Sequence, residues 1–265
     1  MIEETVPIEF NRQIGNDIWL MGFRSEGLAS RVKPGQFLMV RTEGVSNDPL
    51  LRRPFSVHGI GDGGIISILY RIVGRVTSLL STAREHEHIS VIGPLGKGFP
   101  LPGDSEQAIL VAGGMGVAPL FFLSQSLPLE LRSDTQMLLG FPTSREVVLI
   151  EQIRALGLEL SLATEDGSAG FKGTVTDLFE RIIDPAAGKP IIYACGPNAM
   201  LKKIVREAGK RKLPCYVSLE GYMACGLGLC LGCAVKAARK EKTEYYYACK
   251  DGPVFSAEMI DWEAM

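Results

Sequence analysis

The chain lacks a strong excess of either charge, a membrane-length apolar run and a dense set of cysteines. Its 28 Lys and Arg residues nearly balance 30 Asp and Glu residues. This argues against nucleic-acid binding, which favours a strongly basic face. The apolar run 108–123 is shorter than the ~20 residues of a membrane span and contains three glycines and Pro119. Six cysteines in 265 residues are too few for a disulfide-stabilised secreted scaffold.

The amino terminus, MIEETVPIEF, has no basic leader followed by an apolar core. We therefore expect no signal peptide, and we predict a soluble, cytoplasmic protein without a membrane partner. A content of 46% hydrophobic and 22% charged residues excludes wholesale disorder. The length allows two modest domains or one large one.

Three zones follow one another along the chain. Residues 1–102 read as short strands separated by turn residues, which predicts a small antiparallel β-barrel or sandwich. The strands are expected at 37–41, 53–60 and 64–74. A short helix is expected at 77–84, with Thr77 as its amino-terminal cap.

Residues 103–212 alternate strand and helix patterns, which predicts an α/β unit with a parallel sheet covered on both faces. The strands are expected at 108–112, 136–141, 158–163 and 190–196, and the helices at 117–125, 174–183 and 198–209. Residues 213–265 begin with a predicted strand at 215–220 and continue into a glycine-rich segment that contains four cysteines. The sequence thus predicts a multi-domain chain divided at 102/103 and 212/213.

The cysteine segment has the most specific spacing in the chain. Cys225, Cys230 and Cys233 follow a C-x4-C-x2-C pattern, and Cys249 comes after fifteen intervening residues. Plant-type [2Fe–2S] ferredoxins use this spacing, because four thiolates must converge on two irons. A structural zinc site usually has two C-x2–4-C knuckles, whereas this segment has one, so zinc is the weaker alternative. Cys215 lies outside the spacing and is predicted to be a core residue.

Two segments of the barrel zone suit an anionic cofactor. The segment Arg53-Pro54-Phe55-Ser56 offers a guanidinium for a pyrophosphate and a hydroxyl for a flavin edge. Its alternative interpretation is a strand start with a surface arginine. Tyr70 and Arg71 could add an aromatic ring and a second cation, and the turn at 74–77 opens a helix whose amino terminus suits phosphates.

Two segments of the α/β zone suit a dinucleotide. Gly113, Gly114 and Gly116 follow a strand, and Pro119 lies in the helix that comes next. This is not the G-x-G-x-x-G fingerprint, and a tight structural turn is the alternative. Cys195-Gly196-Pro197 ends another strand, at the edge where open α/β sheets bind ligands. Ser144 and Arg145 could contact a 2′-phosphate, so NAD and NADP both stay open.

No catalytic acid or base is predicted, because His58, His86 and His88 lie in strand or loop context without a convincing cluster. Taken in order, the segments resemble the ferredoxin–NADP reductase superfamily, and within it the family of electron-transfer subunits of class 1B dihydroorotate dehydrogenases. The resemblance covers almost the whole chain. It rests on RRPFSV (52–57), ILYRIVG (68–74), GPLGKGF (93–99), LVAGGMGVAPL (110–120), ACGPNAML (194–201), SLEGYMACGLGLCLGCAV (218–235) and CKDGPVF (249–255).

The resemblance implies three cofactor sites and names their residues. FAD would be held in the barrel domain by Arg53, Pro54, Phe55, Ser56, Tyr70, Arg71, Ile72, Val76 and Thr77. NAD(H), an exchangeable substrate, would contact Gly113, Gly114, Gly116, Pro119, Cys195, Gly196 and Pro197. The [2Fe–2S] cluster would be ligated by Cys225, Cys230, Cys233 and Cys249. Val76 and Met115 replace the Gly and Ile that are more usual in the family.

The implied activity is an oxidoreductase relay between NAD(H), FAD and the cluster. The implied partner is an FMN-containing dihydroorotate dehydrogenase catalytic subunit, which oxidises dihydroorotate to orotate in pyrimidine biosynthesis and would join this chain in a heterotetramer. Cys225 favours this family, because a related small subunit of NAD(P)H-dependent ferredoxin reductases tends to have Asp there. Such a ferredoxin reductase subunit is the first alternative, and a zinc-stabilised binding module without redox activity is the second.

Overall fold

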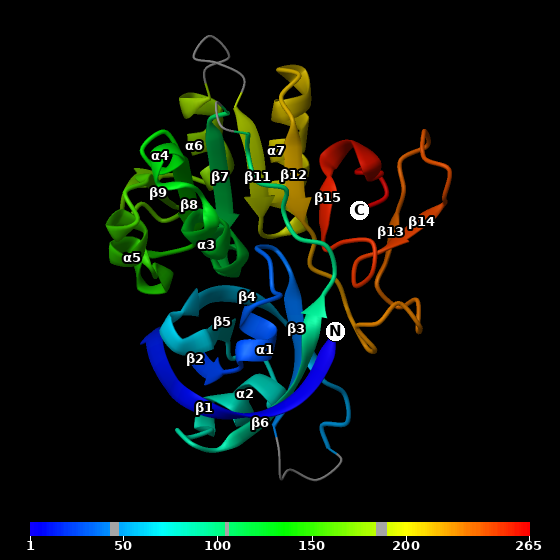
Figure 1. Cartoon of the computed structure of the whole chain (residues 1–265). Helices are drawn as coiled ribbons and strands as arrows, with labels where there is room; N and C mark the ends of the chain where they lie inside the picture. The colour runs from blue at the N-terminus through cyan, green and yellow to red at the C-terminus, as the bar shows by residue number, and fades with distance from the viewer. Residues whose placement is uncertain (43–47, 104–105, 184–189) are drawn as a thin grey trace.

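The computed structural model describes residues 1–42, 48–103, 106–183 and 190–265. The amino-terminal part is a closed barrel of six antiparallel strands in the order β1-β2-β5-β4-β3-β6 (Figure 1). Its strands are β1 (Ile2–Gly15), β2 (Ile18–Arg24), β3 (Phe37–Thr42), β4 (Arg53–Gly61), β5 (Ile65–Arg71) and β6 (His88–Leu95). Two short helices lie in the connections between strands: α1 (Glu26–Ala29) between β2 and β3, and α2 (Arg75–Thr82) between β5 and β6. The predicted antiparallel barrel is confirmed.

Helix α2 begins before the position that the sequence predicted. The helix starts at Arg75 with Gly74 as its cap, so the prediction that Thr77 occupies the cap position was wrong. Thr77 stabilises the helix start from inside the first turn. Its hydroxyl oxygen accepts hydrogen bonds from the N–H groups of Val73 at 2.9 Å and Gly74 at 3.1 Å. A side chain at the third helical position that accepts from the N–H of the capping residue supplies one half of a capping box.

The second part is a seven-stranded sheet in the order β10-β9-β8-β7-β11-β12-β15. All neighbouring strands are parallel except β12 and β15. The strands are β7 (Ala108–Gly113), β8 (Gln136–Phe141), β9 (Glu159–Thr164), β10 (Phe171–Lys172), β11 (Ile191–Cys195), β12 (Cys215–Ser218) and β15 (Val254–Ser256). The α-helices are α3 (Val117–Ser126), α4 (Leu129–Arg132), α5 (Ile150–Ala155), α6 (Val175–Ile182) and α7 (Asn198–Lys210). Short 3-10 turns are η1 (Asp62–Gly64), η2 (Gly114–Gly116), η3 (Ser144–Glu146) and η5 (Ala257–Met259).

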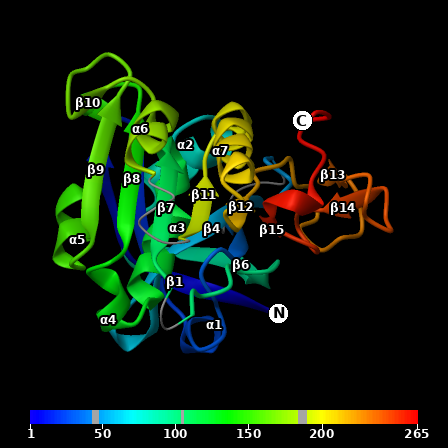
Figure 2. The same ribbon diagram turned by 90° about the horizontal axis from the view of Figure 1, so that it is seen from above.

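Helices cover both faces of this sheet, as predicted. Alternate residues of β7 point to opposite sides: Leu110 packs with α3 and α5, whereas Ile109 and Val111 pack with α6 and α7. Figure 2 shows the strands in a row with α6 and α7 on one side. Strands buried on both faces read as continuous apolar runs, which explains the sequence of this zone.

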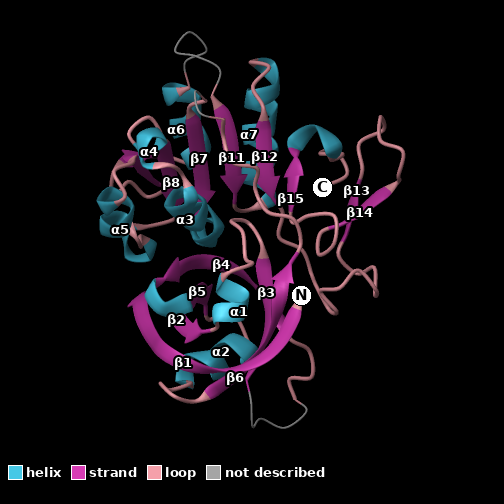
Figure 3. Cartoon of the chain, viewed as in Figure 1, coloured by secondary structure: helices cyan, strands magenta, loops and turns pink. Residues whose placement is uncertain are grey.

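The carboxyl-terminal segment joins the sheet and also forms a small hairpin. Strand β12 pairs with β11, and β15 pairs with β12, so the sheet extends beyond the proposed 212/213 boundary. Between these strands, β13 (Ala234–Lys236) pairs with β14 (Tyr245–Tyr247) in a separate two-stranded sheet (Figure 3). The division into three domains stays a prediction. No helix among the described residues is long and apolar enough to span a membrane.

Candidate functional site

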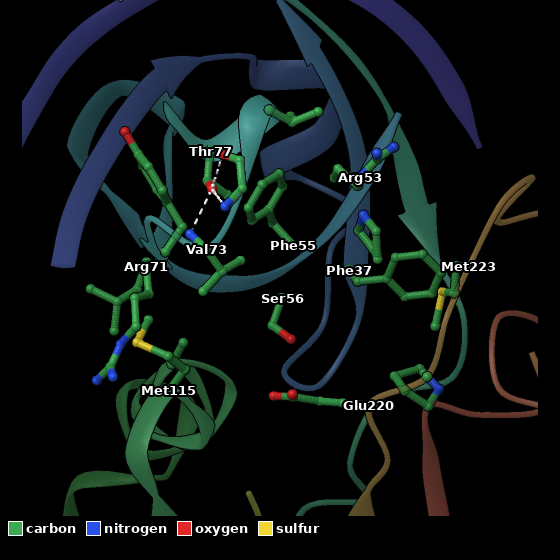
Figure 4. A pocket seen from close by; sticks show the side chains of 18 of the residues that line it. Phe37, Arg53, Phe55, Ser56, Arg71, Val73, Thr77, Met115, Glu220 and Met223 are labelled. Atoms are coloured by element: carbon green, nitrogen blue, oxygen red, sulfur yellow. Dashed lines mark hydrogen bonds between the residues drawn. The ribbon is translucent and has the colours of Figure 1, made fainter. Parts of the chain in front are cut away.

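A cavity of about 520 Å³ lies where the barrel meets the sheet and the cysteine segment. Strand β4 contributes the predicted segment 53–56, and the end of β5 and the start of α2 contribute further walls (Figure 4). The predicted flavin residues that line it are Arg53, Pro54, Phe55, Ser56, Tyr70, Arg71, Val76 and Thr77. Ile72 is not among the lining residues. The structure therefore brings together all but one of these predicted residues.

The walls of this cavity suit a flavin dinucleotide. The N–H groups of the first helical residues, Arg75, Val76 and Thr77, have no carbonyl acceptor within α2, and the helix presents this amino terminus to the cavity. A Cβ added to Gly74 would meet no atom within 4 Å, so the turn leaves open space beside these donors. Arg53 adds a cation and Phe55 an apolar wall. Val76 packs into the barrel core, which accommodates the side chain at this position.

Tyr70 lines the first cavity and is otherwise buried in the barrel. Its side chain is only 2% exposed, and its hydroxyl donates a hydrogen bond of 2.9 Å to Asn11 Oδ1. Burial raises the pKa of this hydroxyl. The Asn11 amide in turn donates to the carbonyls of Leu80 and Ala83 at the end of α2. Asn11 therefore connects β1 to the end of α2, and the Tyr70 hydroxyl donates to the oxygen of the same amide.

A second cavity of about 620 Å³ lies at the carboxyl ends of the parallel strands. Open α/β sheets bind dinucleotides at this edge. The predicted residues that line it are Gly113, Gly114, Gly196 and Pro197. Lining residues that sequence reasoning missed are Glu146, Glu165 and Lys203. Glu146 and Glu165 come soon after the ends of β8 and β9, and this position at the binding edge of the sheet was the signal available in the sequence.

Three predicted dinucleotide residues are absent from the lining of this second cavity. A Cβ on Gly116 would lie 2.1 Å from the carbonyl oxygen of Cys195, so this glycine permits close contact between the turn η2 and the end of β11. Pro119 is buried within α3. Cys195 is 2% exposed, and burial raises the pKa of its thiol. These residues shape the sheet edge, and their contact with a dinucleotide stays a prediction.

The two cavities adjoin, because Arg71, Met115 and Glu220 line both of them. Figure 4 shows the Glu220 carboxylate below Ser56 on the floor of the first cavity. Partial desolvation raises the pKa of the Glu220 carboxyl. The sequence motif at 218–235 includes this glutamate, but the sequence alone predicted no role for it. A dinucleotide in the second cavity would have direct access to the first.

The four predicted metal ligands gather beside the barrel in two pairs. The sulfurs of Cys233 and Cys249 lie 3.2 Å apart. Cys225 and Cys230 are linked by a backbone N–H of Cys230 that lies 3.5 Å from the Cys225 sulfur. Among the described residues, no group of three ligating side chains already has the arrangement of a metal site. Four cysteines gathered in this way supply the ligand set of a [2Fe–2S] cluster, and a four-cysteine zinc site uses the same set.

Backbone N–H groups point at these sulfurs. The Cys225 sulfur accepts from Leu227 N–H at 3.3 Å, and the Cys249 sulfur accepts from Gly228 N–H at 3.1 Å. Burial opposes ionisation of Cys225, but its hydrogen bonds outweigh burial and lower its pKa to about 6. Gly226 and Gly228 have φ of 70° and 76°, which a side chain would strain. The loop is therefore built to present donors to negatively charged sulfur.

An apolar core connects the thiols to the first cavity. Phe37 and Met39 of β3 pack in one cluster with Cys233 and Cys249, and Met223 packs against it. Phe37 and Met223 also line the first cavity. The second cavity, the first cavity and the core around the thiols therefore adjoin one another in that order.

This fold and arrangement of sites define an NAD-linked electron-transfer protein of the ferredoxin reductase type. Residues 220–261 match the iron–sulfur cluster binding domain of dihydroorotate dehydrogenase B, and residues 110–206 match the oxidoreductase NAD-binding domain. The electron transfer subunit of dihydroorotate dehydrogenase B (NAD(+)) from Desulforamulus reducens is 38% identical, over 94% of this chain and 95% of the relative. The subunit from Geobacillus kaustophilus is 42% identical over 85% of each chain. The chain belongs to the family of dihydroorotate dehydrogenase B electron transfer subunits.

Solved structures agree with this assignment. The NADH-dependent reduced ferredoxin-NADP oxidoreductase, described in work on flavin-based electron bifurcation, has a TM-score of 0.82 and 28% identity, and the match covers 98% of this chain and 90% of that chain. The ferredoxin reductase of carbazole 1,9a-dioxygenase has a TM-score of 0.68 and 19% identity over 80% of this chain and 67% of that chain, and it shares the fold. The findings support FAD, a [2Fe–2S] cluster and NAD(H) as the cofactor set and disfavour the zinc-stabilised module.

Proposed function

We propose that this chain relays electrons between NAD(H) and an FMN-containing catalytic subunit that interconverts dihydroorotate and orotate in pyrimidine biosynthesis. The observation that carries the proposal is the continuity of the three sites. Arg71, Met115 and Glu220 are shared by the two cavities, and Phe37 and Met223 connect the first cavity to the thiols. An electron-transfer chain needs its centres close together and separated by dry protein.

The residues have separate roles in this proposal. Arg53 and the amino terminus of α2 would bind the FAD pyrophosphate, while Phe55 and Ser56 would orient the ring. Cys225, Cys230, Cys233 and Cys249 would hold the cluster. FAD, when bound, supplies the exchange between two-electron hydride chemistry and one-electron chemistry. We propose residues 1–102, 103–212 and 213–265 as the FAD, NAD and cluster domains.

The second cavity favours NAD over NADP. Glu165 follows β9 and lines the cavity, and a carboxylate beside an adenosine ribose can accept a hydrogen bond from a 2′-hydroxyl but repels a 2′-phosphate. Arg145, which the sequence offered as a 2′-phosphate ligand, is exposed and is not among the lining residues. Curated relatives whose names include NAD(+) support the same preference.

The catalytic subunit would dock over the thiols. The loop that contains Cys225 and Cys230 also contains four exposed large apolar side chains, here called the apolar surface patch: Tyr222, Leu227, Leu229 and Leu231, with Tyr222 97% and Leu229 78% exposed. Large apolar side chains clustered on a surface commonly mark a protein interface. Exposed Cys230 lies within the same loop, so docking there would place the partner beside the cluster. A heterotetramer of two copies of each subunit would repeat this contact.

The experiment starts from anaerobically purified holoprotein. NADH should bleach the flavin absorbance. Addition of the catalytic subunit, dihydroorotate and NAD(+) should produce NADH, and omission of this chain should stop production. A reconstituted pair that stays inactive, together with rapid reduction of ferredoxin by the chain alone, would instead establish a ferredoxin reductase. The structural similarity to the ferredoxin-NADP oxidoreductase makes that the second candidate.

A further inference from the structure

Arg71 forms an ion pair across the boundary between the barrel and the α/β part. The residue ends β5, and its Nη2 atom lies 2.5 Å from Oε2 of Glu146 in the turn after β8. The two side chains are 31% and 19% exposed, so the pair is partly shielded from water. Partial burial makes such a contact stronger than an exposed surface pair.

The position of this ion pair allows Arg71 to exchange Glu146 for another anionic partner. Arg71 lines both cavities, and Glu146 lines only the second. In Figure 4 the Arg71 side chain extends beside Met115 and away from Arg53. Its Nε atom is buried and has no hydrogen-bond partner among the described residues. The guanidinium therefore has donor capacity that Glu146 does not use.

The charges of the second cavity show why Arg71 matters. Its lining cations are Arg71 and Lys203, and its lining carboxylates are Glu146, Glu165 and Glu220. A dinucleotide brings a pyrophosphate with two negative charges into this acidic surrounding. Guanidinium binds phosphate oxygens through two parallel hydrogen bonds, in the same way that it binds a carboxylate. Glu146 and a phosphate would thus compete for one group.

We propose that Glu146 is a positioning residue that holds Arg71 until a dinucleotide phosphate displaces it, and thereby limits the affinity for the dinucleotide. The phosphate would belong to NAD(H) or to FAD, because Arg71 borders both cavities. The inference rests on the proposed function, which assigns these two ligands to the cavities. The apparent affinity for a ligand equals the intrinsic affinity multiplied by the fraction of molecules in which the binding group is free. Removing the charge of Glu146 while keeping its shape should therefore tighten phosphate binding.

The test uses the holoprotein and the substitution Glu146→Gln. Calorimetric titration with ADP-ribose, which contains the pyrophosphate but cannot accept hydride, should show roughly three- to tenfold tighter binding. Binding of adenosine should not change, because adenosine contains no phosphate. If the phosphate belongs to FAD, flavin retention after dilution should increase instead. Glu151→Gln is the matched control, because Glu151 forms an exposed pair with Arg154.

A double-mutant cycle separates competition from a merely structural contact. In an Arg71→Gln background, Glu146→Gln should have no further effect on either ligand, since no guanidinium remains to release. Unchanged or weaker binding of both ADP-ribose and FAD in the Glu146→Gln protein would overturn the proposal. If that variant does not fold, Glu146→Asp provides the same comparison, because the shorter side chain holds its carboxylate farther from Arg71. Wild-type holoprotein that is not bleached by NADH would refute the proposed function, while the flavin-retention measurement would still test Glu146.

Discussion

The cysteines predicted to bind the cluster differ in how readily they ionise. Hydrogen bonds from backbone N–H groups overcome the effect of burial and bring the pKa of Cys225 to about 6. At Cys249, burial and the adjacent Cys233 thiol raise the pKa to about 12. A metal ligand must be deprotonated, so the positive charge of a bound metal would be needed more at Cys249 than at Cys225. Cys225 already favours the thiolate form.

Replacing Cys225 with Ser should separate reduction of the flavin by NADH from electron transfer to the catalytic subunit. We expect loss of most cluster iron and of its visible absorbance, while NADH still reduces the flavin at a rate within about twofold of wild type. Transfer to the catalytic subunit should fall by more than about tenfold. Cys215→Ala is the control, because Cys215 is buried among the sheet and α7 and should leave the iron content unchanged. Loss of flavin reduction in the Cys225→Ser protein would show that the cluster chiefly maintains the fold.

His58 should make stability depend on pH. Its ring is stacked on Phe121 at 4.5 Å between the barrel and α3, and burial lowers its pKa to about 4. Between about pH 4 and pH 6.5 the unfolded chain binds a proton that the folded chain does not. The contribution of neutral His58 is therefore complete above about pH 6.5 and decreases as pH falls, by about 2 kcal/mol at about pH 5.

Denaturant unfolding of wild type and a His58→Phe variant at about pH 7.5 and about pH 5 measures this effect. The variant keeps the stacked ring and removes the titrating nitrogen. We expect its free energy of unfolding to decrease less on acidification than that of the wild type. The same decrease in both proteins would assign the acid sensitivity to other groups.

At the scale of elements, the start of α2 joins stability to flavin binding. The Thr77 hydroxyl fixes the turn before the helix, and that turn borders the flavin cavity. Thr77→Val should cost about 1 kcal/mol of stability, as expected for loss of a helix cap, and should weaken FAD retention. Thr82→Val, at the exposed end of the same helix, is the control. Equal loss of FAD in both variants would contradict a specific role for the turn.

The local sequence pattern predicted the strands and helices whose apolar residues repeat with a single regular spacing. The observed bounds of β8 are those predicted, and α3, α6 and α7 begin within one residue of their predicted starts. The start of α2 was missed because its first turn is stabilised by a threonine side chain that reaches backward. The role of β15 as a sheet strand was also unpredicted, because pairing between β12 and β15 is decided by contacts across the chain.

At the scale of the whole molecule, the apolar surface patch should control assembly. A Leu229→Glu substitution should weaken binding to the catalytic subunit by more than about tenfold, because a charge at the centre of an apolar interface is desolvated without a partner. NADH reduction of the flavin should be unchanged. Leu129→Glu, at a leucine of similar exposure on α4, is the control. Surface plasmon resonance with the catalytic subunit measures both, and similar losses would place the interface elsewhere.

The sequence by itself determined the classes of element, the barrel followed by a parallel sheet, and the four thiols as candidate ligands. These follow from short-range rules: side-chain period, turn chemistry and cysteine spacing. Only the tertiary structure decided that Glu146 faces Arg71, 75 residues away in sequence, that Glu220 borders two cavities, and that Cys195 is buried. Such contacts arise when separately formed elements pack together, and charge or burial at one position leaves no periodic trace in the sequence around it.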